Sequence, residues 1–232
     1  MSTGDSNIKI TPSPSLTRGV YNIFMKLYLS SYKFGDNPQQ LADLYGENKK
    51  VAVIVNAWDV YPDGERRQSG IQKEIDGLSQ IGLKPELIDL RNYFNKPEEL
   101  KNKLNEFGGL WVTGGNTFVL RRAYKESGMD NWLQTHMRDK ELVYAGYSAG
   151  VCILSPSLMG LETVDEPNTI PDGYKDEIIW DGLNIIDFAF APHYKSDHPE
   201  SEMVDNEVEH YQKTGVKFKT LHDGEVIIME TN

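Results

Sequence analysis

Short apolar runs alternate with amphipathic segments between residues 50 and 148, and this alternation limits the chain to a few folds. The runs KKVAVIVNA and GGLWVTGG are almost continuously apolar, which is typical of strands that are buried on both faces. The segment RRQSGIQKEIDGLSQIG between them has apolar residues at helical spacing and ends on a glycine. Strands connected by helices pair in parallel through right-handed crossovers. The sequence therefore predicts a three-layer α/β fold, a doubly wound and mostly parallel sheet with helices on both faces.

The same patterns assign the remaining elements. LKPELIDL and ELVYAGYS are predicted strands, and PEELKNKLNEFG and TFVLRRAYKESG are predicted helices. After residue 156 the pattern changes. Shorter strands are predicted in IIWDG, LNIIDFAFAPH, VKFKTLH and EVIIME, with a polar loop over 162–177 and a helix over 199–214. We expect this second half to extend the sheet with antiparallel strands.

No repeat or linker divides the chain, so we expect a single domain over residues 21–232. The first 20 residues are polar and lack the apolar core of a signal peptide, which predicts a flexible lead-in over 1–20. The composition, 39% hydrophobic and 25% charged residues, is typical of a soluble globular protein. A single cysteine, Cys152, excludes an internal disulfide and is typical of a cytoplasmic location.

The formal net charge of −11 limits the kinds of partner that the chain can bind. Nucleic acids and anionic membranes require clustered positive charge, so neither is expected as a partner. No run of 18 apolar residues is present, so no membrane span is expected. We therefore expect a small-molecule or small-peptide substrate. A homodimer is compatible with an exposed sheet edge.

Two unusual loops follow predicted strands, VTGGNTF over 112–118 and AGYSAG over 145–150. In open parallel sheets, ligands bind beyond the carboxyl ends of the strands. Both loops should therefore open onto the same edge of the sheet. This convergence predicts a functional site at that edge.

Ser148 lies at the centre of the second loop, in the pattern G-x-S-x-G. In this pattern a sharp strand-to-helix turn lifts a nucleophilic serine above the sheet, and the glycines avoid clashes between the turn and its neighbours. The amide of Ala149 would then donate to a developing oxyanion. The alternative is a structural turn that happens to contain a hydroxyl group.

A serine nucleophile requires a base, and His193 is the candidate because it follows the apolar run FAFAPH at another strand end. The alternative is a surface histidine that ends a strand. A carboxylate would hold the histidine in one tautomer. Asp165 is the first candidate for this acid and Glu225 the second, and periodicity does not decide between them.

The sequence gives only weak evidence for a metal site or a nucleotide site. His198 lies five residues after His193 with acidic residues nearby, but this spacing is not a recognised zinc pattern, so no metal is expected. The loop VTGGNTF could contribute the amide of Gly115 to an oxyanion hole, or it could simply begin a helix with Asn116 or Thr117 as its cap. Neither G-x-G-x-x-G nor G-K-[ST] is present, which argues against a nucleotide, and no cofactor is expected.

Three segments together resemble peptidase family S51. They are GGNTF at 114–118, YAGYSAG at 144–150 and APH at 191–193. The early segment LSSYKFGDNPQQLADL followed by KKVAVIVNA is also similar to the opening of peptidase E-like members of this family. The resemblance covers residues 25–230. It implies a class I glutamine amidotransferase-like α/β sandwich, also described as flavodoxin-like, in accord with the alternation of strands and helices.

The resemblance also implies roles for individual residues. Ser148 would be the nucleophile, His193 the base and Asp165 the acid of a serine peptidase. Gly115 and Ala149 would form its oxyanion hole. The family includes α-aspartyl dipeptidases, which cleave dipeptides with an N-terminal aspartate, and cyanophycinases, which cleave β-linked aspartyl–arginine polymers. A serine dipeptidase is thus the first expectation, and a β-aspartyl hydrolase is an alternative.

An aspartyl side chain in the substrate would require a cation in the pocket. Arg121, Arg122 and Lys195 lie near the predicted site loops in the sequence, and Asn116 lies within one of them. Asn116, Arg121 and Lys195 are therefore the candidates for substrate binding. The alternative is that each cation is a solvated surface charge.

Two further functions use the same fold. A thiol enzyme would need a reactive cysteine, whereas Cys152 lies in an apolar stretch that is typical of a buried small side chain. A non-catalytic protein that binds a small ligand is the second alternative. The presence of both Ser148 and His193 argues against it.

Overall fold

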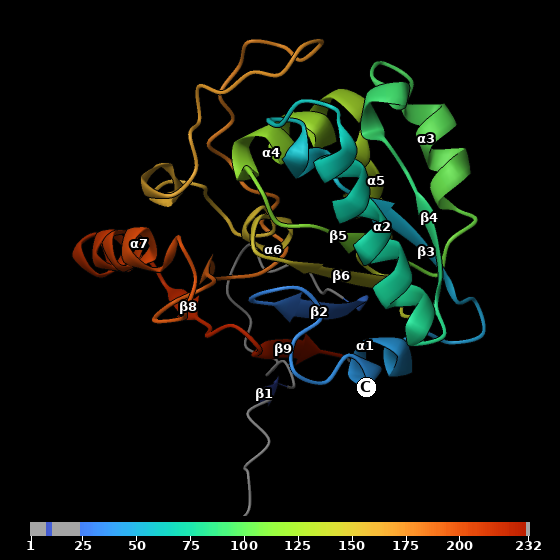
Figure 1. Ribbon diagram of the computed structural model, residues 1–232, viewed down its shortest axis with the longest axis horizontal. Coiled ribbons are helices and arrows are strands. Elements are labelled where there is room, and N and C mark those ends of the chain that lie inside the picture. Colours follow the sequence, from blue (N-terminus) through green and yellow to red (C-terminus); the bar gives the residue numbers. More distant parts are fainter. Residues whose placement is uncertain (1–7, 11–23, 231–232) are drawn as a thin grey trace, which may run out of the picture.

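The structure is a computed structural model that describes residues 8–10 and 24–230. A seven-stranded sheet with the order β1-β9-β2-β6-β5-β3-β4 forms its centre (Figure 1). Its strands are β1 (Ile8–Ile10), β2 (Lys26–Ser30), β3 (Lys50–Ile54), β4 (Lys84–Leu87), β5 (Gly109–Val112), β6 (Val143–Tyr147) and β9 (Val226–Met229).

The middle of this sheet is parallel, as the alternation predicts. Strands β2, β6, β5, β3 and β4 pair in parallel, whereas β9 runs antiparallel to β2 and pairs in parallel with β1. Every residue of β5 and β6 is buried. Side chains alternate between two cores, so that Val51 and Val53 face one side of the sheet while Ala52 and Ile54 face the other.

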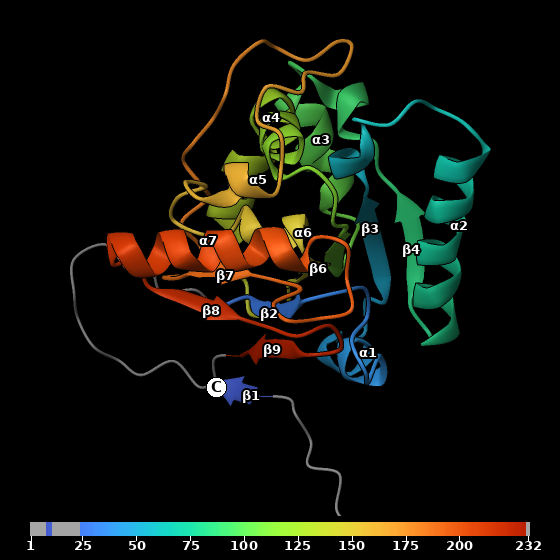
Figure 2. The ribbon, with the colours of Figure 1, turned by 60° about the vertical axis from the view of Figure 1, so that its left-hand side comes forward.

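Helices cover both faces of the sheet, which confirms the predicted three-layer fold (Figures 1 and 2). One face packs against α1 (Gln39–Leu44) and α2 (Glu65–Gln80). The other face packs against α3 (Pro97–Leu104), α4 (Thr117–Ser127), α5 (Met129–His136) and α6 (Ala149–Cys152). Short 3-10 helices lie at η1 (Asn56–Trp58), η2 (Leu90–Tyr93) and η3 (Leu161–Thr163).

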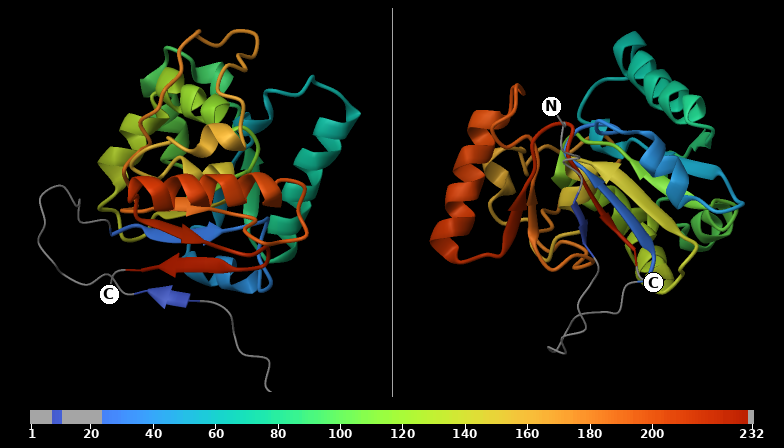
Figure 3. Two further views of the ribbon diagram at one scale, coloured as in Figure 1. Left: turned by 90° about the vertical axis from the view of Figure 1, so that its left-hand side faces the viewer. Right: turned by 90° about the horizontal axis from the view of Figure 1, so that it is seen from below.

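The second half of the chain differs from the prediction in its pairing. Strands β7 (Ala189–Ala191) and β8 (Phe218–Thr220) form a separate two-stranded parallel sheet rather than an antiparallel extension. The reason is the helix between them, α7 (Ser201–Thr214), which makes β7-α7-β8 a parallel crossover unit. Helix α7 lies alongside this small sheet (Figure 3), and its Val204 and Val208 belong to one hydrophobic cluster with β7 and β8 residues.

The predicted strand in IIWDG is also absent, and only one isolated bridge, Ser157 with Asp181, forms there. Of the predicted lead-in over 1–20, Ile8–Ile10 forms strand β1 beside β9, and the rest lies outside the described residues. The strand predicted in EVIIME is β9, which does join the main sheet in antiparallel pairing with β2. No helix among the described residues combines the length and the apolar character needed to cross a membrane.

The arrangement brings five strand ends to one side of the molecule. Ser31 follows β2, Gly114 follows β5 and Ser148 follows β6 in the main sheet. His193 follows β7 and Asp223 follows β8 in the small sheet. The ends of two sheets therefore meet where the sequence predicts a site.

Candidate active site

Ser148 stands on a strained turn between β6 and α6. Its φ of +48° and ψ of −121° fall in a region that residues other than glycine rarely adopt. A Cβ atom on Gly150 would lie 2.4 Å from the carbonyl oxygen of Val112, and one on Gly146 would lie 2.7 Å from the same oxygen. Both positions thus require glycine because β5 passes directly beside the turn. This is the strand–turn–helix context of a nucleophile elbow.

Tyr147 anchors the elbow on the opposite face of the sheet. Its hydroxyl donates to Oε1 of the buried Glu74 in α2 at 3.2 Å, and Nε1 of Trp111 donates to Oε2 of the same carboxylate at 2.8 Å. Burial raises the pKa of Glu74. Strand β6, which Ser148 follows, is therefore fixed to helix α2, which packs directly on this face of the sheet.

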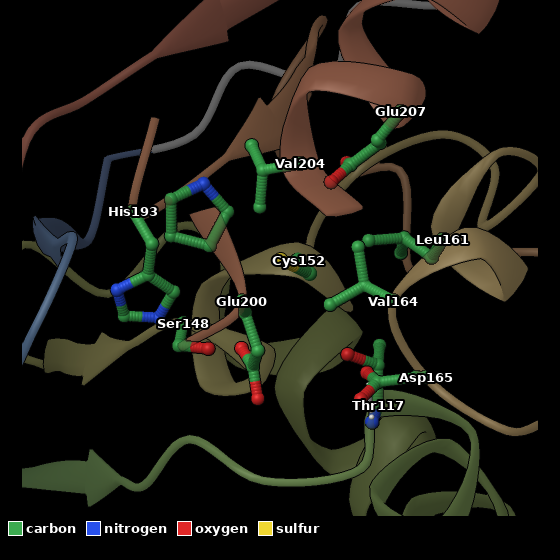
Figure 4. Close-up of a pocket in the computed structure, with 11 residues that line it drawn as sticks. Thr117, Ser148, Cys152, Leu161, Val164, Asp165, His193, Glu200, Val204 and Glu207 are labelled. Atoms are coloured by element: carbon green, nitrogen blue, oxygen red, sulfur yellow. Dashed lines mark hydrogen bonds between the residues drawn. The ribbon is translucent and has the colours of Figure 1, made fainter. Parts of the chain in front are cut away.

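His193 is almost completely buried, and its ring orientation is set by hydrogen bonds. Its backbone amide donates to Oγ of Ser31 at 2.8 Å, and its Nδ1 lies 2.6 Å from Oδ1 of Asp223. A carboxylate partner keeps the proton on Nδ1, so Nε2 is the nitrogen that can accept a proton. Burial lowers the pKa of His193, which favours the neutral ring, the form that can accept a proton. His193 and Ser148 line the same pocket (Figure 4).

Asp223 is held by three contacts. Its Oδ1 accepts hydrogen bonds from Ser31 Oγ at 3.0 Å as well as from His193, and its backbone amide donates to Ser196 Oγ at 2.8 Å. A carboxylate fixed in this way can orient the imidazole and stabilise its protonated form.

The two acids predicted from the sequence contact other groups. Asp165 accepts a hydrogen bond from the backbone amide of Thr117 at 2.8 Å and lines the pocket, but it does not contact His193. Oε2 of Glu225 accepts from the backbone amide of His222 at 2.7 Å. Neither of these acids forms a hydrogen bond with His193, whose Nδ1 lies beside Asp223 instead. The signal of Asp223 in the sequence was the same as for His193, a polar residue just after a strand.

The glycine loop after β5 runs against the elbow. A Cβ on Gly114 would lie 3.0 Å from the Cβ of Ser148, and Gly115 has φ of +128° with Ala57 immediately behind it. The Gly115 amide donates no hydrogen bond to another described residue. Ala149 is the first residue of α6, so its amide has no intrahelical acceptor. Both amides remain predicted donors to an oxyanion.

The three residues predicted to bind substrate have other contacts. Asn116 caps α4, with its Oδ1 accepting from the amide of Val119 at 2.9 Å. Arg121 forms an ion pair with Asp130 at 3.3 Å. Lys195 is exposed, with Nζ stacked over a tyrosine ring. None of the three lines the pocket that contains Ser148.

The pocket beside Ser148 is acidic. Asp165, Glu200 and Glu207 line it, and neither lysine nor arginine is among the described residues of its wall (Figure 4). Burial raises the pKa of Asp165 to about 6, that of Glu200 to about 7 and that of Glu207 to about 8. Repulsion from Asp165 adds to the pKa shift of both glutamates. Asp165 was predicted at the site as the acid that orients the histidine, whereas Glu200, which precedes α7, and Glu207, within α7, were not predicted as site residues.

One group of three potential metal ligands occurs among the described residues: His193, His198 and Glu200, whose donor atoms lie within 4.8 Å of one another. The two imidazole rings are stacked at 3.7 Å between centroids, with only 8° between their planes. An imidazole binds a metal through a lone pair in its ring plane, so two parallel stacked rings do not direct their lone pairs to one point. The geometry thus disfavours a shared metal ion.

Cys152 does not have the properties of a reactive thiol. It is buried, and its Sγ donates to the carbonyl oxygen of Phe190 at 3.4 Å. Burial raises its pKa well above the ordinary value, which suppresses the thiolate form. The thiol-enzyme alternative therefore has no support from the site.

Comparison with known proteins adds an independent line of support. The model of peptidase family S51 matches residues 29–232. An uncharacterized peptidase of Listeria monocytogenes is 32% identical over 119 residues, which cover 51% of this chain and 55% of that protein. A Drosophila melanogaster protein named as a probable alpha-aspartyl dipeptidase is 29% identical over 112 residues, 48% of this chain and 43% of the relative. The chain thus matches about half the length of these curated relatives.

The chain is also similar to a crystal structure, and this similarity covers a longer part of the chain. A Listeria monocytogenes protein assigned as peptidase E superimposes with a TM-score of 0.68 at 26% identity, covering 90% of this chain and 99% of that one.

Proposed function

This chain belongs to peptidase family S51 and is a serine-type peptidase, and we propose that it cleaves small peptides, specifically dipeptides with an N-terminal aspartate, through Ser148, His193 and Asp223. One observation carries the assignment of residues. A serine in a strained elbow shares a pocket with a buried histidine whose Nδ1 is fixed by a carboxylate. This combination is the arrangement of an activated serine nucleophile.

The reaction follows from these groups. Ser148 Oγ attacks the scissile carbonyl carbon while Nε2 of His193 accepts the hydroxyl proton. The carbonyl oxygen becomes an oxyanion that the amides of Gly115 and Ala149 receive. The protonated histidine, stabilised by Asp223, then gives its proton to the leaving amine, and the C–N bond breaks. Water next attacks the acyl-enzyme ester with His193 as base, which releases the acid and restores Ser148.

The preference for an N-terminal aspartate is supported by relatives. The Drosophila relative carries the name of an alpha-aspartyl dipeptidase, and the superimposed Listeria structure is assigned as peptidase E. The limited free space beside Ser148 also favours substrates with very little chain on the amino-terminal side of the scissile bond.

The test is a panel of Asp-X, β-Asp-X and control dipeptides, with release of free amino acids as the measurement. We expect cleavage of Asp-X, and Ser148→Ala should reduce kcat/KM by about 10³-fold or more with the fold unchanged. Ser69→Ala, a change of an exposed serine in α2, is the matched control and should keep full activity.

The other possible results would each contradict a different part of the proposal. Cleavage of β-Asp-X alone would overturn the α-aspartyl specificity but not the nucleophile. Labelling of Ser148 by a fluorophosphonate without any dipeptide cleavage would show a serine hydrolase with another substrate. Full activity in Ser148→Ala would overturn the mechanism itself.

A further inference from the structure

A second histidine covers one face of the proposed base. The ring of His198 stacks on the ring of His193, with 3.7 Å between the centroids and 8° between the planes. The side chain of His193 is 2% exposed, whereas that of His198 is 18% exposed. His198 therefore lies on the more exposed side of the stack, and the two rings meet through their flat faces.

His198 is itself held by two neighbours. The ring of Tyr32 packs edge-on against both histidines, with its centroid 5.4 Å from that of His198 and 5.8 Å from that of His193. The backbone amide of Glu200, just before α7, donates a hydrogen bond to Nδ1 of His198 at 3.3 Å. The ring of His198 thus has a fixed place over the base, unlike a freely moving surface side chain.

The hydrogen bond from Glu200 also shows which form of His198 is stacked on the base. An Nδ1 atom that accepts from an amide carries no proton, so this ring is neutral with its proton on Nε2. Burial lowers the pKa of His198, which favours the same neutral form. The π electrons of a neutral ring attract a cation on their face, so the stack can persist after His193 has taken up a proton.

His193 needs such a support because its hydrogen bond to Asp223 fixes only part of its orientation. Rotation of an imidazole about its Cβ–Cγ bond has a broad energy minimum, so the surroundings must set the plane of the ring. Asp223 holds the Nδ1 edge of the ring. A flat group against the ring face resists a tilt out of this plane, and such a tilt would carry Nε2 away from Ser148.

We propose that His198 is a positioning residue of the active site: its ring, backed by Tyr32, fixes the plane of the His193 ring. Nε2 of the base then stays directed at Ser148 throughout the reaction. The inference rests on the proposed role of His193 as the base and adds a residue to that machinery. His198 transfers no proton itself, so the flatness of its side chain, rather than its nitrogen atoms, is the property that matters.

The kinetic test compares His198→Ala with His198→Phe on Asp-Leu. Alanine removes the flat face, so we expect kcat to fall by about 10- to 100-fold with little change in KM, as for a catalytic group displaced by about 1 Å. Phenylalanine restores a flat ring without a titratable nitrogen and should recover most of the lost kcat. His136→Ala is the matched control and should change neither value, because it removes a histidine that stacks on Trp132 in α5 and does not line the pocket.

The proton on Nδ1 of His193 gives a second measurement that needs no substrate. A ring fixed against Asp223 protects this proton from exchange with water, so its NMR signal is sharp. We expect a sharp signal in the wild type and in His198→Phe, and a broadened or missing one in His198→Ala. If the signals differ in this way while no dipeptide is cleaved, the positioning role stands and the proposed dipeptidase activity fails.

Three results would overturn the positioning role. They are a wild-type kcat in His198→Ala, an equal loss of kcat in His198→Phe and His198→Ala, and an equally sharp His193 signal in all three proteins. Should His198→Ala fail to fold, His198→Leu replaces it in both measurements, because leucine fills the space but has no flat face.

Discussion

At the scale of single residues, the site depends on backbone conformations that cost free energy. Ser148 and His193 both have positive φ values, +48° and +59°, although neither is a glycine. Such conformations persist only where the surroundings impose them. For Ser148 the surroundings are the close approach of β5 and the Tyr147 contact with Glu74. For His193 they are the two hydrogen bonds that tie it to Ser31 and Asp223.

Removing the charge of Asp223 tests its role at this scale. We predict that Asp223→Asn lowers kcat by about 10²- to 10⁴-fold, because an amide partner favours the wrong tautomer of His193. The KM value should change much less. Steady-state kinetics is the measurement, and Asp197→Asn, an exposed change four residues after His193, is the control. A value of kcat within a few-fold of the wild type would remove Asp223 from the mechanism.

The pH profile tests the base. Burial, the largest cause, lowers the pKa of His193 below the ordinary value of 6.5, so the ring stays neutral to more acidic pH than a solvated histidine. Since only the neutral ring accepts the serine proton, kcat should rise with pH and reach half its maximum below pH 6.5. A midpoint of kcat above that value would contradict the buried environment of His193.

Sequence patterns predicted that Ser148 and His193 lie at one site, and both line the same pocket, but they did not predict Asp223 as the partner of His193. Ser148 and His193 each follow an apolar strand, and strand ends converge in parallel sheets. Asp223 also follows a strand, but that strand belongs to the small sheet, whose parallel pairing was not predicted. Glu207 lies on a helix face that no motif marks. Its place in the pocket depends on how α7 packs, which local sequence does not encode.

At the scale of elements, the segment between η3 and β7 is held across α4 rather than in a sheet. The guanidinium group of Arg122 donates to the carbonyl oxygens of Pro167, Thr169 and Glu177. Tyr174 reaches the buried Asp59. The apolar residues that predicted a strand in IIWDG instead pack on the helix, with Trp180 edge-on to Phe118 at 5.3 Å. The apolar residues of IIWDG are therefore packed as expected, but against helix α4 rather than within a sheet.

We expect Arg122 to hold the segment between η3 and β7 in a fixed conformation. We predict that Arg122→Ala lowers the free energy of unfolding by about 2–5 kcal/mol, because three half-buried hydrogen bonds from a charged donor are lost. Protease cleavage within 167–177 should become much faster. Chemical denaturation and limited proteolysis are the measurements. Lys125→Ala removes an exposed ion pair with Glu177 and should have little effect on either. Equal protease resistance in Arg122→Ala would contradict this role.

At the scale of the whole molecule, the buried acids make stability depend on pH. Burial raises the pKa of Glu207 in the folded state from 4.5 to about 8, so between these values the folded protein holds a proton that the unfolded chain releases. The stabilisation is complete below about pH 4.5 and is lost as the pH rises to about 8. The raised pKa values of Glu200 and Asp165 act in the same direction.

Replacement of Glu207 should remove much of this dependence. We predict that Glu207→Gln and the wild type have similar free energies of unfolding near about pH 5, and that the variant is the more stable near about pH 8.5. Urea denaturation at both pH values is the measurement. Glu209→Gln is the control and should follow the wild type at each pH. Parallel curves for Glu207→Gln and the wild type would show that the Glu207 carboxyl ionises in the folded state as easily as in the unfolded one.

The division of the proposed catalytic groups between two sheets has a consequence for biosynthesis. Ser148 and its anchors belong to the main sheet, whereas His193 and Asp223 belong to β7, β8 and the turns after them, and Ser31 joins the two. On the ribosome the nucleophile emerges first, while the carboxylate that would complete the machinery emerges much later. In a nascent chain, Ser148 would thus lack its base and acid until the last strands dock. Activity would then arise only after the last strands have been synthesised and have docked on the main sheet.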